Sequence, residues 1–95
     1  MTDQASAEYS RFRIGGRTPD GDLVILDGDK QVDIMNEHKD FDGMVDITLF
    51  ARSIRKWRYP HDEEPITEEM RKIIVRETIR LLEAKYFSVR VKVEW

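Results

Sequence analysis

The chain has 95 residues, of which 40% are hydrophobic and 37% are charged, with no cysteine and a formal net charge of −3. A chain of this length and apolar content folds as one domain and is not a disordered protein. The lack of cysteine excludes disulfides, thiolate zinc sites and a cysteine nucleophile. It also fits a reducing compartment, so we expect a cytoplasmic protein. The sequence shows neither a leader pattern nor a run near the roughly 18 apolar residues of a membrane span, which predicts no membrane association.

The first half of the chain predicts short strands separated by turns. Residues 1–8 show no periodic pattern, so we expect a flexible N-terminus and a single domain over residues 9–95. Gly15-Gly16 is typical of a turn, and Asp27-Gly28-Asp29 predicts the tight turn of a hairpin. The polar stretch Asn36–Gly43 predicts a loop. Alternating or continuous apolar residues predict four strands, at Tyr9–Ile14, Leu23–Leu26, Lys30–Met35 and Met44–Phe50.

The second half predicts one long helix followed by a last strand. Thr67 is suited to cap a helix from Glu68 to about Lys85, in which apolar residues recur at helical spacing. Val75 and Ile79 widen the apolar arc of this helix, which indicates that it is covered from more than one direction or contributes to an oligomer interface. Phe87–Trp95 alternates strictly and predicts a half-buried strand, with Trp95 in the core. The order predicts an α+β domain, in which an antiparallel sheet of about five strands packs one face on the helix.

The charge of the chain is unevenly distributed. Residues 20–46 contain nine acidic side chains against two lysines, a net charge of −7, whereas the rest of the chain carries +4. Such a segment repels the phosphate backbone, which argues against a nucleic-acid partner and allows steering of a basic protein. A solvated acidic face without a partner explains the same pattern. The candidate partner-binding residues are Asp27, Asp29, Asp33, Glu37, Asp40 and Asp42.

No constellation of residues predicts catalysis, a metal site or a cofactor. His61 lies in His61-Asp62-Glu63-Glu64, which lacks the spacing that sets metal ligands on one face, and His38 is explained by loop polarity. Gly15-Gly16 is not followed by the residues of a phosphate-binding loop. Arg52–Arg58 is basic and contains Trp57, so it admits a nucleic-acid patch, although the pattern is more typical of a buried tryptophan beside solvated arginines. We therefore expect no enzyme.

The segment from Ser53 to Glu69, with the helix and strand after it, resembles a family of bacterial immunity proteins that are encoded beside polymorphic toxins. The resemblance is best over Met44–Trp95 and depends on a Ser-Ile-x-x-Trp-x-x-Pro stretch that precedes an acidic loop. It implies a protein that binds a cognate toxin in the cytoplasm and blocks it stoichiometrically. Residues shared by proteins that neutralise different toxins are expected to hold the fold. In this chain the structural motif residues are Ser53, Trp57, Pro60 and Pro65.

Two other interpretations stay open at this stage. The wide apolar arc of the predicted helix and the edge of the last strand fit a small structural or regulatory homodimer module without a toxin partner. The second alternative interpretation is a small enzyme that uses acidic residues for catalysis.

Overall fold

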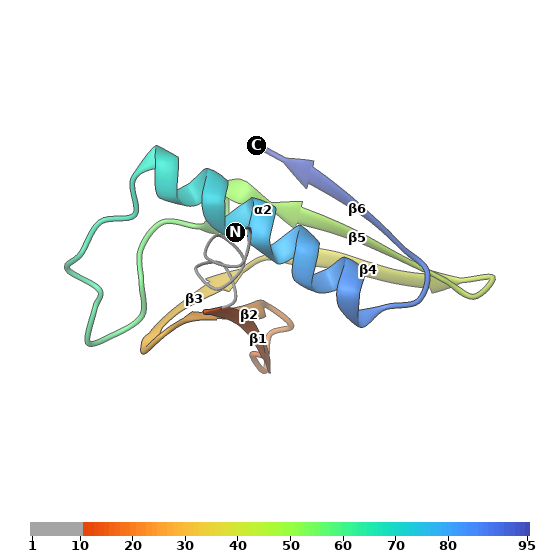
Figure 1. The fold of residues 1–95 in the computed structure, drawn as a ribbon, viewed down its shortest axis with the longest axis horizontal. Coiled ribbons are helices and arrows are strands. Elements are labelled where there is room, and N and C mark those ends of the chain that lie inside the picture. The colour runs from red at the N-terminus through yellow and green to blue at the C-terminus, as the bar shows by residue number, and fades with distance from the viewer. Residues whose placement is uncertain (1–10) are drawn as a thin grey trace, which may run out of the picture.

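The computed structural model describes residues 11–95, except for the side chain of Phe41. The segment expected to be flexible, residues 1–8, and the first residues of the predicted strand Tyr9–Ile14 lie outside the described residues. The remaining chain forms six strands, a short 3₁₀ helix and one long α-helix (Figure 1). This confirms the α+β class and the place of the helix in the C-terminal half. The strands are divided between two three-stranded sheets, whereas one antiparallel sheet of about five strands was predicted.

The first sheet contains β1 (Phe12–Arg17), β2 (Leu23–Asp27) and β3 (Lys30–Ile34), all antiparallel. Gly15 and Gly16 were predicted to form a turn, but they lie inside β1, where the pairing with β2 shifts by one residue. A β-carbon on Gly15 would lie 3.0–3.1 Å from the side chains of Leu26 and Val24. The two glycines therefore produce a bulge in the strand and do not end it.

The second sheet contains β4 (Asn36–Phe41), β5 (Met44–Phe50) and β6 (Val89–Glu94). The prediction of a loop at Asn36–Gly43 was wrong, because β4 pairs with β5 along its whole length. The strand escaped prediction because, as an edge strand of polar residues, it shows no apolar alternation. β6 lies parallel to β5, since a helix connects these two strands and brings the chain back to the end from which β5 began. The last strand is shorter than predicted, and Phe87 precedes it.

The two hairpin turns have different backbone geometry. In the β2–β3 turn, only Gly28 has a positive φ, of 64°. In the β4–β5 turn both central residues are left-handed, with φ of 52° at Asp42 and 75° at Gly43. This is the pattern of a type I′ turn, whose twist matches that of the flanking strands. The Asp-Gly step therefore carried a hairpin signal within the segment that was predicted to be a loop.

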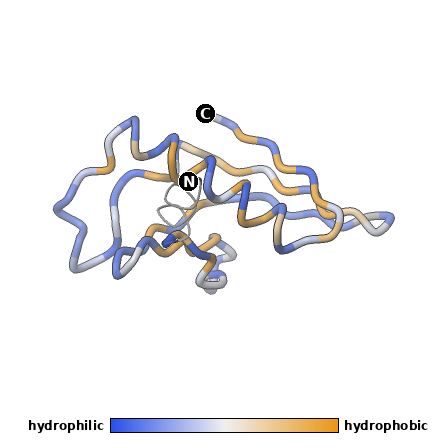
Figure 2. Tube along the Cα trace, in the orientation of Figure 1, coloured by the Kyte–Doolittle hydropathy of each residue, from blue (hydrophilic) through white to orange (hydrophobic). Residues whose placement is uncertain are grey.

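The helix α2 (Glu68–Lys85) has the predicted bounds and begins as predicted. The hydroxyl of its N-cap, Thr67, accepts a hydrogen bond from the backbone N–H of Met70. The helix packs against both β1 and β6, so it joins the two sheets and is covered from more than one direction. Figure 2 shows apolar and polar residues alternating along α2 and along β6, as expected for elements with one buried side. No helix among residues 11–95 combines the length and the apolar character needed to cross a bilayer.

A single core lies between the sheets and α2. Burying each of its large aliphatic side chains contributes roughly 1.5–3 kcal/mol. The short helix η1 (Ala51–Ser53) and the segment after it complete this core from the side of β5. The largest fully buried apolar side chains are Ile25, Ile34, Ile47, Leu49, Ile54, Ile74, Leu82 and Val32.

Candidate functional site

The six carboxylates predicted to bind a partner do not form one surface. Asp27, Asp29 and Asp33 belong to the β2–β3 hairpin, whereas Glu37, Asp40 and Asp42 belong to β4 and the turn after it. β3 leads into β4 through the single residue Met35. The β2–β3 and β4–β5 turns therefore point away from each other and lie at opposite ends of the molecule (Figure 1).

Arginines from outside the acidic segment neutralise two of the three carboxylates in the β2–β3 hairpin. Arg11 Nε lies 2.6 Å from Asp27 Oδ1, and Arg58 Nη1 lies 3.0 Å from Asp33 Oδ2. The two aspartate side chains are only 10% and 13% exposed. Asp29 is the exposed member of this group, and its Oδ2 lies 3.5 Å from Nε2 of His61. The net charge of residues 20–46 does not include these two arginines, because Arg11 and Arg58 lie outside that segment of the sequence.

The four motif residues lie where the segment after β5 is attached to the sheets. Ser53 Oγ donates to the Phe50 carbonyl and accepts from the Met35 N–H. Trp57 is buried in the core, as predicted, and Lys30 Nζ lies 5.5 Å from the centroid of its ring. Pro65 pairs with Lys56 across the loop that contains Pro60, whose peptide bond is cis. These contacts fit a structural role.

The basic segment Arg52–Arg58 lines a groove of about 550 Å³ beside the exposed side chain of Met35. Because Trp57 is buried, it is not available to stack on a nucleic-acid base. Asp33 also lines the groove and holds Arg58, which reduces its positive charge. Among the described residues, no three histidine, cysteine or acidic side chains are grouped so that they could hold a metal ion.

The β4–β5 hairpin carries the other three carboxylates, and all three residues are exposed. Asp40 and Asp42 lie at its turn, whereas Glu37 lies near the start of β4, at the end away from the turn. Glu37 lies opposite Thr48 and is out of phase with the buried Ile47, so it is on the outer face of the sheet. Asp40 lies opposite Val45, on the face that α2 covers, and Asp42 forms the turn itself. Negative charge is therefore present on both faces and at the tip.

An exposed aromatic residue, Phe87, lies at the same end of the sheet. The N–H of Val45 donates a hydrogen bond of 3.0 Å to the carbonyl of Ser88, which holds the connection between α2 and β6 against the hairpin. Phe87 precedes Ser88, and its side chain is fully exposed. Sequence analysis assigned this residue to the strand, and its exposure became visible only with the start of β6 at Val89. We call Asp40, Asp42 and Phe87 the hairpin end.

Hydrogen bonds link Asp40 to His38 and His38 to Arg17. His38 Nε2 lies 2.9 Å from Asp40 Oδ1, and Arg17 Nη2 lies 3.0 Å from His38 Nδ1. The ring of His38 meets that of Tyr86 edge-on, with centroids 6.1 Å apart. Because Arg17 can only donate, Nδ1 of His38 is the acceptor in that contact, which leaves Nε2–H to donate to Asp40. His38 is thus part of the hairpin's support, where sequence analysis found only loop polarity.

Trp95 does not lie in the core, contrary to the prediction. Its side chain follows the last residue of β6 and is 55% exposed, on one wall of a groove between β6 and α2. The strict alternation of the strand gave the correct phase for this residue. It could not show that the core ends before the strand does.

Comparison with known proteins gives one family. The family described as immunity protein 74 matches residues 13–92, which is most of the chain. No curated protein and no solved structure matches the chain. The match extends over both sheets and α2 and thus covers the fold as a whole. The chain belongs to the immunity protein 74 family.

Proposed function

We propose that this protein binds a cognate toxin polypeptide one to one in the cytoplasm of the producing cell and blocks it without turnover. The match to an immunity protein family over residues 13–92 carries this proposal. Such a protein acts by occupying a surface of its partner. The chemistry therefore resides in the toxin, and the binding surface is what this chain supplies.

The hairpin end is our proposed contact surface. It combines two exposed carboxylates with a fully exposed phenylalanine. Aromatic anchors carry much of the energy of protein interfaces, and surrounding charges steer the encounter and set its specificity. The β4–β5 hairpin also projects from the body of the molecule (Figure 1), so it can enter a concave surface.

The negative charge of the hairpin end favours a toxin with a basic cleft. Proteins that act on nucleic acids need lysine and arginine to neutralise phosphates, and those side chains attract carboxylates equally well. We therefore propose a toxin of this kind, whose cleft the hairpin covers or enters. Two further exposed candidates are Asp29, at the opposite end of the molecule, and Glu37, on the outer face of β4 away from the turn. Asp27 and Asp33 remain in the proposal as partly covered members, each already paired with an arginine.

A binding measurement with an inactivated product of the adjacent gene tests the proposal. The double variant Asp40→Asn, Asp42→Asn keeps the shape of each side chain and removes two negative charges. Asparagine is suited to position 42, because it tolerates the left-handed backbone found there. We expect titration calorimetry to show binding weakened by at least about tenfold, with a smaller dependence on salt.

A matched control separates local charge from net charge. The variant Asp20→Asn, Glu63→Gln removes the same number of negative charges from exposed positions outside the hairpin end. We expect its affinity to stay within about twofold of the unmodified protein. Equal losses in both double variants would reject the hairpin end as the contact surface. No binding of the adjacent product by the unmodified protein would reject the proposed function.

A further inference from the structure

The strand β6 has a free edge. In the part of the chain that the structure describes, β6 pairs with β5 on one side and ends the sheet on the other (Figure 1). The hydrogen bond from Val45 N–H to the Ser88 carbonyl fixes which peptide groups face β5. In a parallel pair these groups alternate, so the N–H and C=O of Val89, Val91 and Val93 point to the free edge.

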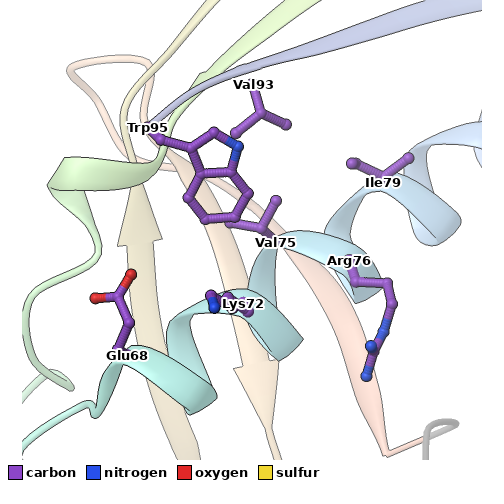
Figure 3. A pocket seen from close by; sticks show the side chains of 7 residues that line it. All are labelled: Glu68, Lys72, Val75, Arg76, Ile79, Val93 and Trp95. Carbon is purple, nitrogen blue, oxygen red and sulfur yellow. The ribbon is translucent and has the colours of Figure 1, made fainter.

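An apolar groove lies beside this edge. Val93 and Trp95 form one wall, and Val75 and Ile79 of α2 form the other, around a volume of about 540 Å³. Figure 3 shows the indole of Trp95 lying over Val75. An unpaired strand edge next to an exposed tryptophan is a surface that pairs with another strand.

The sequence of β6 is complementary to itself. We infer that the β6 edge takes β6 of a second copy of this chain, antiparallel, around a two-fold axis at Lys92. In this register Arg90 lies opposite Glu94 of the second copy, and the same pair forms again on the other side of the axis. On the groove face, Val91 lies opposite Val93, and Val89 lies opposite Trp95. Opposite charges and apolar side chains that face each other across an antiparallel pair stabilise it.

The alternative registers are less favourable. A two-fold axis at Val91 would place Arg90 opposite Lys92, so like charges would meet twice. An axis at Val93 pairs Lys92 with Glu94 but loses the contact between Val89 and Trp95. The register at Lys92 uses the whole strand, and its one unfavourable contact, between the two Lys92 side chains, is exposed to solvent and screened by salt. We expect a weak dimer, in roughly the micromolar range.

The inference does not depend on the proposed function. The hairpin end lies at the opposite end of sheet β4–β5–β6 from Trp95, and antiparallel pairing directs the two hairpin ends away from each other (Figure 1). A dimer therefore leaves both hairpin ends open, and failure to dimerise would not contradict the proposal that the protein binds a toxin.

Sedimentation equilibrium of the full chain, from micromolar to millimolar concentration, tests the dimer. We expect reversible dimerisation that Glu94→Arg and Arg90→Glu each weaken by at least about tenfold. An equimolar mixture of these two variants should form a heterodimer, because it restores both opposite-charge pairs. The control is Glu83→Arg, the same charge change on the exposed side of α2, which should leave dimerisation unchanged. A monomer at every concentration, or a dimer insensitive to Glu94→Arg, would overturn the inference.

Engineered cysteines test the register, since the chain has none of its own. Across the axis, residue 92 faces its own copy in a non-hydrogen-bonded pair with about 4.5 Å between α-carbons, within disulfide range. Lys92→Cys should therefore crosslink under mild oxidation, and Val93→Cys should not. Lys92→Thr should strengthen the dimer several-fold by removing the like-charge contact. Crosslinking at residue 93 alone would overturn the register. If the protein is a monomer and Glu94→Arg lowers its affinity for the toxin, the edge belongs to the toxin and not to a second copy.

Discussion

The hydroxyl of Ser53 accepts a hydrogen bond of 2.9 Å from the backbone N–H of Met35, the residue at which the chain passes from one sheet to the other. The same hydroxyl donates to the Phe50 carbonyl at 2.7 Å, and the N–H of Phe50 donates to the Met35 carbonyl at 2.9 Å. The end of β5 and the junction between β3 and β4 are thus held by three linked hydrogen bonds. This arrangement makes Ser53 important for the relative position of the two sheets.

Replacing Ser53 with alanine should lower the stability of the whole domain. The change removes both side-chain hydrogen bonds and leaves the Met35 N–H without this partner, at a cost of about 1–3 kcal/mol. For a domain of this size each kcal/mol lowers Tm by roughly 4–8 °C, which calorimetry resolves. Ser88→Ala is the control, because Ser88 is also partly buried but its hydroxyl makes no hydrogen bond among residues 11–95. Similar losses in both variants would contradict the assigned role.

Trp57 and Phe87 should differ in their importance for stability although both are large aromatic residues. Trp57 is 2% exposed and packs among core residues, so Trp57→Ala should destabilise the protein by about 3–5 kcal/mol. Phe87 is fully exposed, and Phe87→Ala should change stability by no more than about 0.5 kcal/mol. Denaturant titration measures both values. A substantial loss of stability from Phe87→Ala would show that this side chain packs against the protein itself.

Phe87→Ala should instead weaken toxin binding. If Phe87 anchors the interface, truncating it should cost on the order of 2 kcal/mol, or about thirty-fold in Kd. Tyr59→Ala provides the control, since Tyr59 is also a largely exposed aromatic residue. It lies on the loop that pairs with β3 through Arg58 and Gln31, far from the hairpin end. Calorimetric titration with the inactivated toxin compares the two. Unchanged affinity with Phe87→Ala would leave the carboxylates alone as the proposed contact.

Local signals in the sequence were enough to predict the secondary structure that they control directly. Thr67 and the periodic apolar residues after it gave the bounds of α2. The alternation over Phe87–Trp95 gave the strand after it, which the structure limits to Val89–Glu94. β4 could not be found in this way, because an edge strand of charged residues has no apolar phase to reveal it. The parallel pairing of β5 and β6 is a property of the path through α2, which short-range patterns do not record.

The candidate site was less predictable than the fold. The segment with net charge −7 appeared to be one surface, because adjacent residues in the sequence were assumed to remain adjacent in space. Arg11 and Arg58 lie outside that segment and reach Asp27 and Asp33 only after folding. The extended path through Met35 then places the turn that carries Asp29 and the turn that carries Asp42 at opposite ends of the molecule (Figure 1).

The β4–β5 turn should be sensitive to substitution at Gly43 through its backbone alone. Gly43 has φ of 75°, and a β-carbon added there would meet no atom within 4 Å. Gly43→Ala therefore introduces no clash, but it places a β-carbon on a left-handed residue, at a cost of about 1–2 kcal/mol. Gly43→Asn should cost less, because a short polar side chain tolerates this conformation.

Thermal unfolding should rank the variants in that order. The alanine variant should also bind the toxin more weakly than the asparagine variant, because alanine distorts the turn that presents Asp42. Equal stability of the alanine and asparagine variants would show that the turn relaxes to another geometry, and the hairpin end would then lack the fixed shape on which the proposed contact depends.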